Sequence, residues 1–573
     1  MTVRPPFSPA LLLLLLWAAG SHASCFTGTA NECRKAHPVP GADLAGEGYD
    51  VVRLRRMGAF AVDVQSWRRR DGTCTLCRNS QMEGALQRLP RQVTDWRARP
   101  ACQRHLSSQL YESVGELEDA GASVVDKSWS AGLDVNLKPE TGAKLRVAGT
   151  QSKMAEFARR RSSSDRYSFT AHTFQCQLYE YRLVHRPRPS AQFLRLARSL
   201  PRRPGPSARF FYQRFLRTYG THYISGVRLG GRLHDVTALR TCQVATESQT
   251  VEEVKDCLDI EAEAKMGTKV QADAKYHACQ EARAKLSGRR SFSQEYSDRQ
   301  VEVTGGPIGA AAADLLLSPG QASDFGAWLS GLASQPGVVY HVLEPLHHLL
   351  PGGPAEPRRR LLRRELEAYL RGHAQAGEGR NCSGLCRRGS VPDPRQPCAC
   401  RCRQSQEVDG LCCPRGKGWG LLEVTVTRGR DLWGDYAGGT DAYVRARYRP
   451  AMGPELVATT SVVPNNNNPE WGVSLQLGEV QLGPKEQEGG PGLTVECWDQ
   501  DHGYDDDLLG SCQPRPLAAG RHPHVCYFSY GSLSFEVSLS CGPHLGGSRC
   551  RQYVPQPPPS GLGSGDGAGR PRL

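Results

Sequence analysis

Two groups of aspartates near the carboxyl end of the chain have the chemistry to bind a metal ion. Each group occupies a polar loop after a strand-like stretch, and the members are Asp435, Asp441, Asp499, Asp501, Asp505, Asp506 and Asp507. Carboxylates gathered in one place repel one another unless a cation neutralises them, and a hard divalent ion with about six to eight oxygen ligands suits such loops. Calcium is therefore the expected ion. The alternative is a solvated acidic surface, which is usual for a single run of charge.

The spacing of these aspartates resembles that of the calcium sites of C2 domains. The pattern is Asp-x5-Asp followed by Asp-x-Asp-x5-Asp, and Asn-Pro-Glu-Trp at 468–471 resembles the middle loop of that family. The resemblance implies a set of calcium ligands, namely Asp435, Asp441, Asp499, Asp501 and Asp507, with Asp505 and Asp506 as further candidates. Three aromatic residues flank these loops and suit either the interfacial zone of a bilayer or packing at the end of the domain: Trp433, Tyr436 and Tyr504.

A second informative string lies between residues 219 and 231. It reads Tyr-Gly-Thr-His-Tyr, then six residues, then Gly-Gly. The string resembles the signature of the membrane attack complex/perforin superfamily, whose positions are filled by Tyr219, Gly220, Thr221, His222, Tyr223, Gly230 and Gly231. A helix-like run over 208–218 precedes it and a strand-like run over 223–229 follows. We expect that strand to stop at the two glycines, where the backbone can bend sharply. Taken alone, His222 would be an ordinary core histidine.

The bulk composition predicts a secreted protein of several domains. The 573 residues correspond to about three or four domains, and the net charge of +14 favours anionic partners such as phospholipids. No nucleic-acid-binding motif is present. Arg4, an apolar run over 10–19 and the small residues that follow are typical of a signal peptide over 1–24. Most of the 21 cysteines should then form disulfides, and the odd count leaves at least one unpaired, for which Cys497 is the candidate.

Four parts are expected after the signal peptide. They are a pore-forming domain over 25–375, an EGF-like module over 376–414, a C2 domain over 415–545 and a partly disordered tail over 546–573. Seven cysteines crowd into 382–413, where six of them can form three bridges; a cysteine-rich metal site is the less favoured alternative. Short alternating strands such as 442–448 indicate an all-β sandwich for the C2 domain. The resemblance implies an α+β pore-forming domain with a bent central antiparallel sheet flanked by helical clusters.

The superfamily resemblance also implies how a chain without a second long apolar run enters a membrane. No stretch after the signal peptide approaches the ~20 apolar residues of a transmembrane helix. Members of the superfamily unfurl two helical clusters into β-hairpins, which join into a barrel. The first candidate segment places a polar, helix-compatible run over 152–161 between strand-like runs over 133–137 and 174–183.

The second candidate segment lies between Cys257 and Gly305-Gly306. It begins with 258–266, which alternates apolar and charged residues as a barrel strand with one lipid face requires. A helix-compatible run over 272–287 and an alternating run over 299–303 follow. Surface helices with half-buried strands are the alternative interpretation of both segments.

A few short strands from one chain cannot close a wide barrel, so a ring of chains with head-to-tail contacts is required. Arg214 and Glu344 are candidate complementary charges at that contact. The domain order fits the perforin branch, because complement components lack a carboxyl-terminal C2 domain. The resemblance implies a calcium-dependent cytolysin of cytotoxic lymphocyte granules, with granule proteases as cargo and no enzyme activity of its own. The alternatives are a calcium-dependent lipid-binding adhesion protein that never inserts and a lipase, and the lipase is rejected because no Gly-x-Ser-x-Gly elbow is present.

Overall fold

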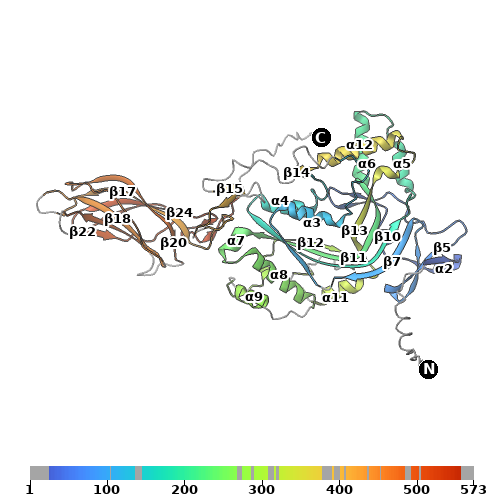
Figure 1. Ribbon diagram of the computed structural model, residues 1–573, viewed down its shortest axis with the longest axis horizontal. Coiled ribbons are helices and arrows are strands. Elements are labelled where there is room, and N and C mark those ends of the chain that lie inside the picture. Colours follow the sequence, from blue (N-terminus) through green and yellow to red (C-terminus); the bar gives the residue numbers. More distant parts are fainter. Residues whose placement is uncertain are drawn as a thin grey trace, which may run out of the picture. The chain divides into compact units, whose positions relative to one another are not determined.

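The described residues form two compact units. The computed structural model describes residues 25–103, 105–135, 145–267, 274–285, 290–307, 315–317, 322–376, 390–392, 400–405, 408–434, 438–451, 453–483, 492–501 and 505–556 (Figure 1). The first unit comprises the chain up to Arg161, Ser168–Leu239 and Val254–Gly379, and the second comprises Ser162–Tyr167, Arg240–Glu253 and the chain from Arg380 onward.

An eight-stranded sheet forms the centre of the first unit. Five of its strands are neighbours in the order β4-β3-β11-β10-β7, while β12 and β13 pair with β11 and β8 pairs with β10. The two long inner strands are β10 (Tyr167–Leu183) and β11 (His222–Arg240). The outer strands are β3 (Glu47–Asp50), β4 (Arg55–Phe60), β7 (Val93–Cys102), β8 (Ser107–Tyr111), β12 (Arg299–Thr304) and β13 (Gly337–Pro345). Because β13 pairs with the first half of β11 and β12 with its second half, both antiparallel, β11 is the common partner of strands far apart in the sequence.

The expectation that the strand after the signature stops at the two glycines is wrong, because β11 continues through both of them to Arg240. A Cβ atom on Gly230 would lie 1.9 Å from the carbonyl oxygen of Cys176 in β10, and one on Gly231 would lie 2.6 Å from the side chains of Trp328 and Leu332. The glycines therefore allow close approach of a neighbouring backbone and of a packed helix. They do not end the strand.

Helices cover both sides of the central sheet of this unit. Helices α3 (Val114–Gly121) and α4 (Lys153–Ser162) lie on one side, and α8 (Val251–Lys265), α9 (Ala274–Lys285) and α11 (Ala322–Gly331) lie on the other (Figure 1). The short helix α10 (Phe292–Glu295) follows α9 in the sequence, and α5 (Ala191–Ser199), α6 (Pro206–Tyr219) and α12 (Pro357–Gly372) lie together as a separate group (Figure 1). Among the residues that the structure describes, no helix combines the length and hydrophobicity that crossing a bilayer would require.

Several local predictions are confirmed by these elements. The helical runs over 152–161, 208–218 and 272–287 correspond to α4, α6 and α9, and the strand-like runs over 174–183 and 299–303 lie within β10 and β12. Residues 133–135 form no strand, and 136–137 lie outside the described residues.

Residues 258–265 of the alternating run form part of helix α8. The buried residues Val254, Leu258 and Ala262 recur every fourth residue and give that helix one apolar face against the protein. The sequence of this segment is therefore compatible with an amphipathic helix as well as with an amphipathic strand.

The amino-terminal end of the chain forms a small four-stranded sheet. Its strands are β1 (Cys25–Gly28), β2 (His37–Pro38), β5 (Cys74–Asn79) and β6 (Ala85–Leu89), with helix α2 (Ala30–Lys35) beside them. The disulfides Cys25–Cys77 and Cys33–Cys74 close this region.

A sandwich of two four-stranded antiparallel sheets dominates the second unit, which confirms the all-β prediction. One sheet contains β17 (Trp419–Arg430), β20 (Glu470–Gln481), β23 (Gly520–Tyr527) and β24 (Ser532–Cys541), and the other contains β18 (Ala442–Arg449), β19 (Leu456–Thr459), β21 (Gly492–Asp499) and β22 (Asp507–Cys512). Inward-facing side chains such as Val424, Val444 and Val537 form its core. Cys497 also lies in that core and is a free cysteine, as expected.

An unexpected disulfide joins the cysteine-rich region to the short helix that follows β11. Cys402 bonds to Cys412, but Cys413 bonds to Cys242 of α7 (Thr241–Thr246), so one of the seven crowded cysteines pairs outside the group. The short strands β15 (Ser390–Pro392) and β16 (Cys400–Cys402) pair with each other, whereas Cys382, Cys386 and Cys398 lie outside the described residues. Near the end of the chain β25 (Leu545–Gly546) pairs with β26 (Gln552–Tyr553), next to the disulfide Cys541–Cys550.

Replacing Gly230 by alanine should destabilise the first unit, because the new methyl group would overlap the Cys176 carbonyl. Overpacking of this kind costs about 1–3 kcal/mol. The matched control is Gly326→Ala in α11, where nothing lies within 4 Å of the added Cβ. That helical position should become slightly more stable, by about 0.5–1 kcal/mol. Thermal unfolding of the two variants measures the difference, and equal midpoints would contradict the close approach.

Candidate calcium site, signature motif and helical segment

Three strands of the second unit bring the predicted aspartates to one end of the sandwich. In the antiparallel register Asp499 of β21 pairs with Ala442 of β18 on one side and with Asp507 of β22 on the other. Asp441 directly precedes β18, and Asp501, Asp505 and Asp506 lie in the connection between β21 and β22. Strand pairing therefore gathers carboxylates that are up to 66 residues apart in the sequence, counted from Asp441 to Asp507. Asp435 lies outside the described residues.

Backbone amides hold these carboxylates in place. The amide of Asp441 donates to Oδ1 of Asp499 at 2.7 Å, and the amide of Asn465 donates to Oδ1 of Asp441 at 2.6 Å. A Cβ on residue 434 would lie 1.7 Å from Oδ2 of Asp499, so Gly434 leaves the space that this buried carboxylate occupies. The loop between β17 and β18 thus packs around Asp499, and Asn465 of the loop before β20 holds that loop through Asp441.

The donor set suits calcium, because it consists of carboxylate oxygens fixed by loops. Within the described residues alone, no group of three or more His, Cys, Asp or Glu side chains is arranged to hold a metal ion. Asp506 differs from its neighbours, since its Oδ2 accepts a hydrogen bond from the hydroxyl of Tyr443 at 2.6 Å. Asp506 therefore anchors the loop between β21 and β22 to β18. The assignment of the other aspartates as calcium ligands remains a prediction.

An exposed aromatic pair lies at the same end of the sandwich. Trp433 is 40% exposed and its ring lies 5.0 Å from that of Tyr530, which is 61% exposed. Tyr530 sits in the turn between β23 and β24, and the sequence analysis missed it because this turn carries no acidic residue. Its Tyr-Phe-Ser-Tyr-Gly composition, with Tyr527 also exposed, was the available signal. Tyr436 and Tyr504 lie outside the described residues.

The signature motif ties the start of β11 to its surroundings. Gly220 has φ +78°, and a Cβ there would lie 2.4 Å from the carbonyl oxygen of Tyr49. The Thr221 hydroxyl donates to that same oxygen and accepts from the amide of Val51, both at 3.1 Å. Tyr219 packs its ring against Phe193 and Phe215. The motif is a packing and hydrogen-bonding element.

His222 is fully buried within the motif. Its Nε2 lies 2.8 Å from the carbonyl oxygen of Trp129, and its Nδ1 lies 2.7 Å from the Thr221 hydroxyl. Burial disfavours the charged ring and lowers the pKa of His222 to about 4. The side chain is therefore neutral at physiological pH.

The two residues predicted at a chain-to-chain contact occupy different elements. Arg214 is exposed on α6, and Glu344 is part of β13. Glu344 accepts a hydrogen bond from the Tyr223 hydroxyl at 2.6 Å and lies 3.6 Å from Nδ1 of His348. The neighbouring His348 is the main cause that lowers the pKa of Glu344, which keeps this carboxylate charged.

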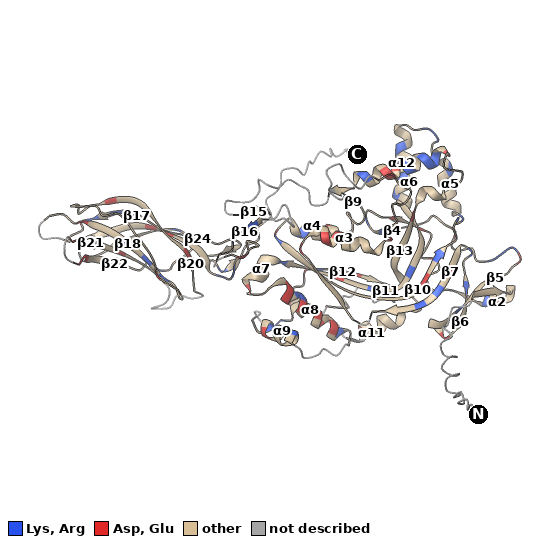
Figure 2. Ribbon diagram, viewed as in Figure 1, with Lys and Arg blue, Asp and Glu red and all other residues tan. Residues whose placement is uncertain are grey.

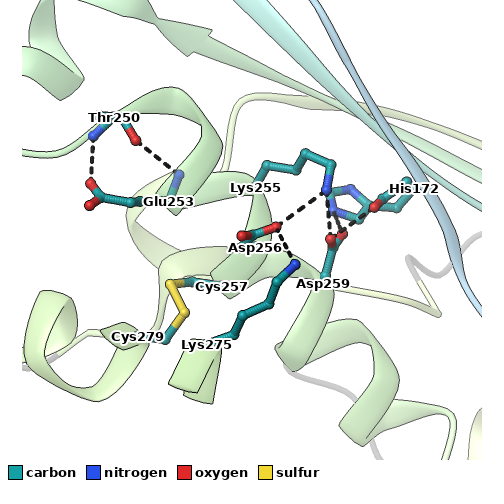
Figure 3. Close-up of polar contacts among 10 residues, drawn as sticks. His172, Thr250, Glu253, Lys255, Asp256, Cys257, Asp259, Lys275 and Cys279 are labelled. Carbon is teal, nitrogen blue, oxygen red and sulfur yellow. Dashed lines mark hydrogen bonds and ion pairs between the residues drawn. A yellow bond between two sulfur atoms is a disulfide. The ribbon is translucent and has the colours of Figure 1, made fainter. Parts of the chain in front are cut away.

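Helix α8 is attached to the sheet by a cluster around Asp259 (Figure 3). One carboxylate oxygen lies 3.0 Å from Nε2 of the buried His172 in β10. The other accepts from Lys255 Nζ and from the Ser108 hydroxyl of β8, both at 2.8 Å. These polar contacts join a helix to two strands of the central sheet.

Further contacts complete the attachment of the helical segments. The disulfide Cys257–Cys279 connects α8 with α9. Glu261 accepts from the amides of Phe292 and Ser293 at 2.8 and 2.9 Å. On the other segment, Arg161 at the end of α4 forms a two-point ion pair with Asp298 at 2.6 and 2.8 Å.

Comparisons with known proteins agree with this architecture. The family model of the MAC/Perforin domain matches residues 38–378, and that of the C2 domain matches residues 420–521. The chain belongs to the MAC/Perforin family and carries a C2 domain.

The chain is also similar over nearly its whole length to individual members of that family. It is 43% identical to Perforin-1 of Homo sapiens over 535 residues, which cover 93% of each chain. It is 40% identical to Perforin-1 of Mus musculus, with 95% of this chain and 96% of the relative covered. The complement component C8 alpha chain of Oryctolagus cuniculus is 23% identical over 478 residues, which cover 78% of this chain and 77% of that one.

Acid should destabilise the first unit through its buried histidines. An unfolded histidine titrates near ~6.5, whereas the pKa of folded His222 is about 4. Between these values the unfolded chain takes up a proton and the folded chain does not, so lowering the pH favours unfolding. Burial likewise lowers the pKa of His341 to about 4 and that of His347 to about 3.

The thermal midpoint of the first unit should therefore fall as the pH is lowered from about 7 to about 4.5. His222→Gln removes one of the titrating groups and should show a shallower fall, whatever its midpoint at neutral pH. An unchanged slope in this variant would contradict the role of His222.

Proposed function

We propose that this protein is a secreted, calcium-dependent, pore-forming cytolysin. In this proposal the C2 domain binds the target membrane, several chains assemble into a ring, and hairpins formed from the two helical segments insert as a β-barrel. The observation that supports it most is the presence of both domains in one chain that aligns with Perforin-1 over 93% of its length. Secretory granules as the storage compartment, cytotoxic lymphocytes as the source and granule proteases as cargo are the finer parts of the same proposal.

Membrane binding rests on the aspartate end of the sandwich. Calcium would be held by Asp441, Asp499, Asp501 and Asp507 together with Asp435. The bound ion supplies positive charge and open coordination positions for lipid phosphate oxygens. Exposed rings, Trp433 and Tyr530 among them, add apolar contact at the depth of the headgroups.

Insertion requires α8 to leave the sheet and become extended. As a strand, residues 258–266 would place Leu258, Ile260, Ala262, Ala264 and Met266 on one face and the charged residues on the other. Asp259 must first lose its contacts with His172 and Ser108. The polar contacts of the attachment involve groups that water can also hydrogen-bond, so their loss leaves no polar group without a partner. The apolar face of Val254, Leu258 and Ala262 must be withdrawn from the protein in the same step.

Ring assembly would bring Arg214 of one chain to Glu344 of the next. Both side chains are available on the single chain, because Arg214 is exposed and the Glu344 side chain is 43% exposed. A lipid-binding adhesion protein would need neither this contact nor the release of α8. Dye release from liposomes separates the two functions.

Calcium-dependent binding should be lost when an aspartate of the site becomes asparagine. Asp501→Asn and Asp441→Asn each remove one negative ligand, so calcium affinity and cosedimentation with liposomes should fall by about tenfold or more. The matched control is Glu479→Gln, which removes an exposed carboxylate of β20 away from these loops. Binding of both aspartate variants like that of the control would refute the ligand assignment.

Cross-linking α8 to the sheet should separate binding from pore formation. Ser108 and Asp259 are in hydrogen-bond contact, so Ser108→Cys with Asp259→Cys should allow a disulfide that holds α8 on β8. The oxidised protein should bind calcium-loaded liposomes but release no dye. Ser108→Ala with Asp259→Ala removes the same contacts without the cross-link and should release dye at least as readily as the unmodified protein. Dye release by the fully cross-linked protein would rule out the release of α8 as a step.

A further inference from the structure

A cavity of about 760 Å³ lies in the first unit between α6, α12 and the β3–β4 segment. On α6 its lining residues Arg209, Gln213 and Leu216 recur at helical spacing, and on α12 Glu365 and Tyr369 do the same. One face of each helix therefore forms a wall. Lys and Arg side chains are frequent on α5, α6 and α12 (Figure 2).

Four arginines line this cavity, which we call the arginine cavity: Arg53, Arg55, Arg209 and Arg217. Two carboxylates, Asp50 and Glu365, line it as well, so four positive charges against two negative ones leave an excess of two. Guanidinium groups stay charged at any physiological pH, so this excess persists.

The carboxylates are already engaged by two of the arginines. Asp50 Oδ2 accepts from Arg53 at 2.8 Å and from the Tyr369 hydroxyl at 2.9 Å. Glu365 lies 3.7 Å from Arg209. Neither Arg55 nor Arg217 forms an ion pair with any residue that the structure describes.

We propose that the arginine cavity binds an organic polyphosphate. The planar fork of a guanidinium matches phosphate oxygens in pairs, and two such groups without a protein carboxylate can each take part of a phosphate chain. The volume falls within the range of about 300–1,000 Å³ that ligand cavities have, which is more than inorganic phosphate alone would fill.

The remaining lining supplies contacts for the organic part of such a ligand. Met57 and Leu216 are apolar, and the rings of Tyr369 and His373 lie 4.3 Å apart beside them. Aromatic faces of this kind can stack on a planar heterocycle. A nucleoside triphosphate therefore combines the two kinds of group that the cavity offers to bind.

The test is titration calorimetry of the full chain with ATP and with inorganic tripolyphosphate. Calcium-free buffer is used, because polyphosphates chelate calcium and the C2 domain could otherwise contribute. Both probes should bind saturably with one site per chain, and ATP should bind more tightly. Absence of saturable binding would overturn the proposal, and equal or weaker binding of ATP would overturn the organic part of it.

Two pairs of variants locate the site. Arg55→Gln with Arg217→Gln should weaken binding by about tenfold or more, because each charge-assisted contact is lost. The control, Arg195→Gln with Arg198→Gln, removes the same charge from the exposed face of α5 outside the cavity. If both pairs of substitutions weakened binding equally, the phosphates would be attracted by the general positive charge of the surface, and the assignment of the site to the arginine cavity would be overturned. If the variant with both glutamines does not fold, Arg55→Lys with Arg217→Lys can replace it. This variant keeps both charges but lacks the planar guanidinium groups, so it should still bind ATP less tightly than the control.

Discussion

The close approach of β10 and β11 is the constraint on which the first unit depends. At Gly230 the two backbones leave no room for a side chain, since a Cβ would overlap the carbonyl oxygen of Cys176. These two strands also hold several of the elements with a proposed function. His172 of β10 holds α8, the second half of β11 pairs with β12, and the signature runs from the end of α6 through the first half of β11. Because β10 and β11 are fixed to each other, helix α8 can leave the sheet in the proposed insertion while the pairing of these two strands is kept.

Local patterns in the sequence were sufficient to predict helices α4, α6 and α9 and parts of strands β10, β11, β12 and β18. The run over 208–218 has an apolar face at helical spacing and a glycine at its end, and α6 is found there. The aspartate spacing predicted loops at one end of a sandwich, and the register around Asp499 brings those loops together. Such signals lie within a few residues of one another, so they are readable without the fold.

Contacts between distant residues account for what the sequence could not predict. The two glycines at 230–231 look like a strand end until Cys176 and Trp328 are known to lie against them. Tyr530 becomes a partner of Trp433 only because β17 and β24 pair at their ends. Cys413 forms its disulfide with Cys242, which is 171 residues away in the sequence, and not with a cysteine of its own cysteine-rich region. No local pattern encodes these neighbours.

The disulfide between Cys257 and Cys279 limits how far its part of the chain can be drawn out. The bond closes a loop with a sequence separation of 22, so residues 258–278 cannot form one straight extended strand while it is intact. Folded back on itself, this loop has two arms of about ten residues, each about 33 Å long at the rise of a β-strand. That length is close to the ~30 Å hydrocarbon thickness of a bilayer. In the proposed insertion, the Cys257–Cys279 bond would limit the depth of a hairpin made from residues 258–278 and would fix the place of its turn by chain length alone.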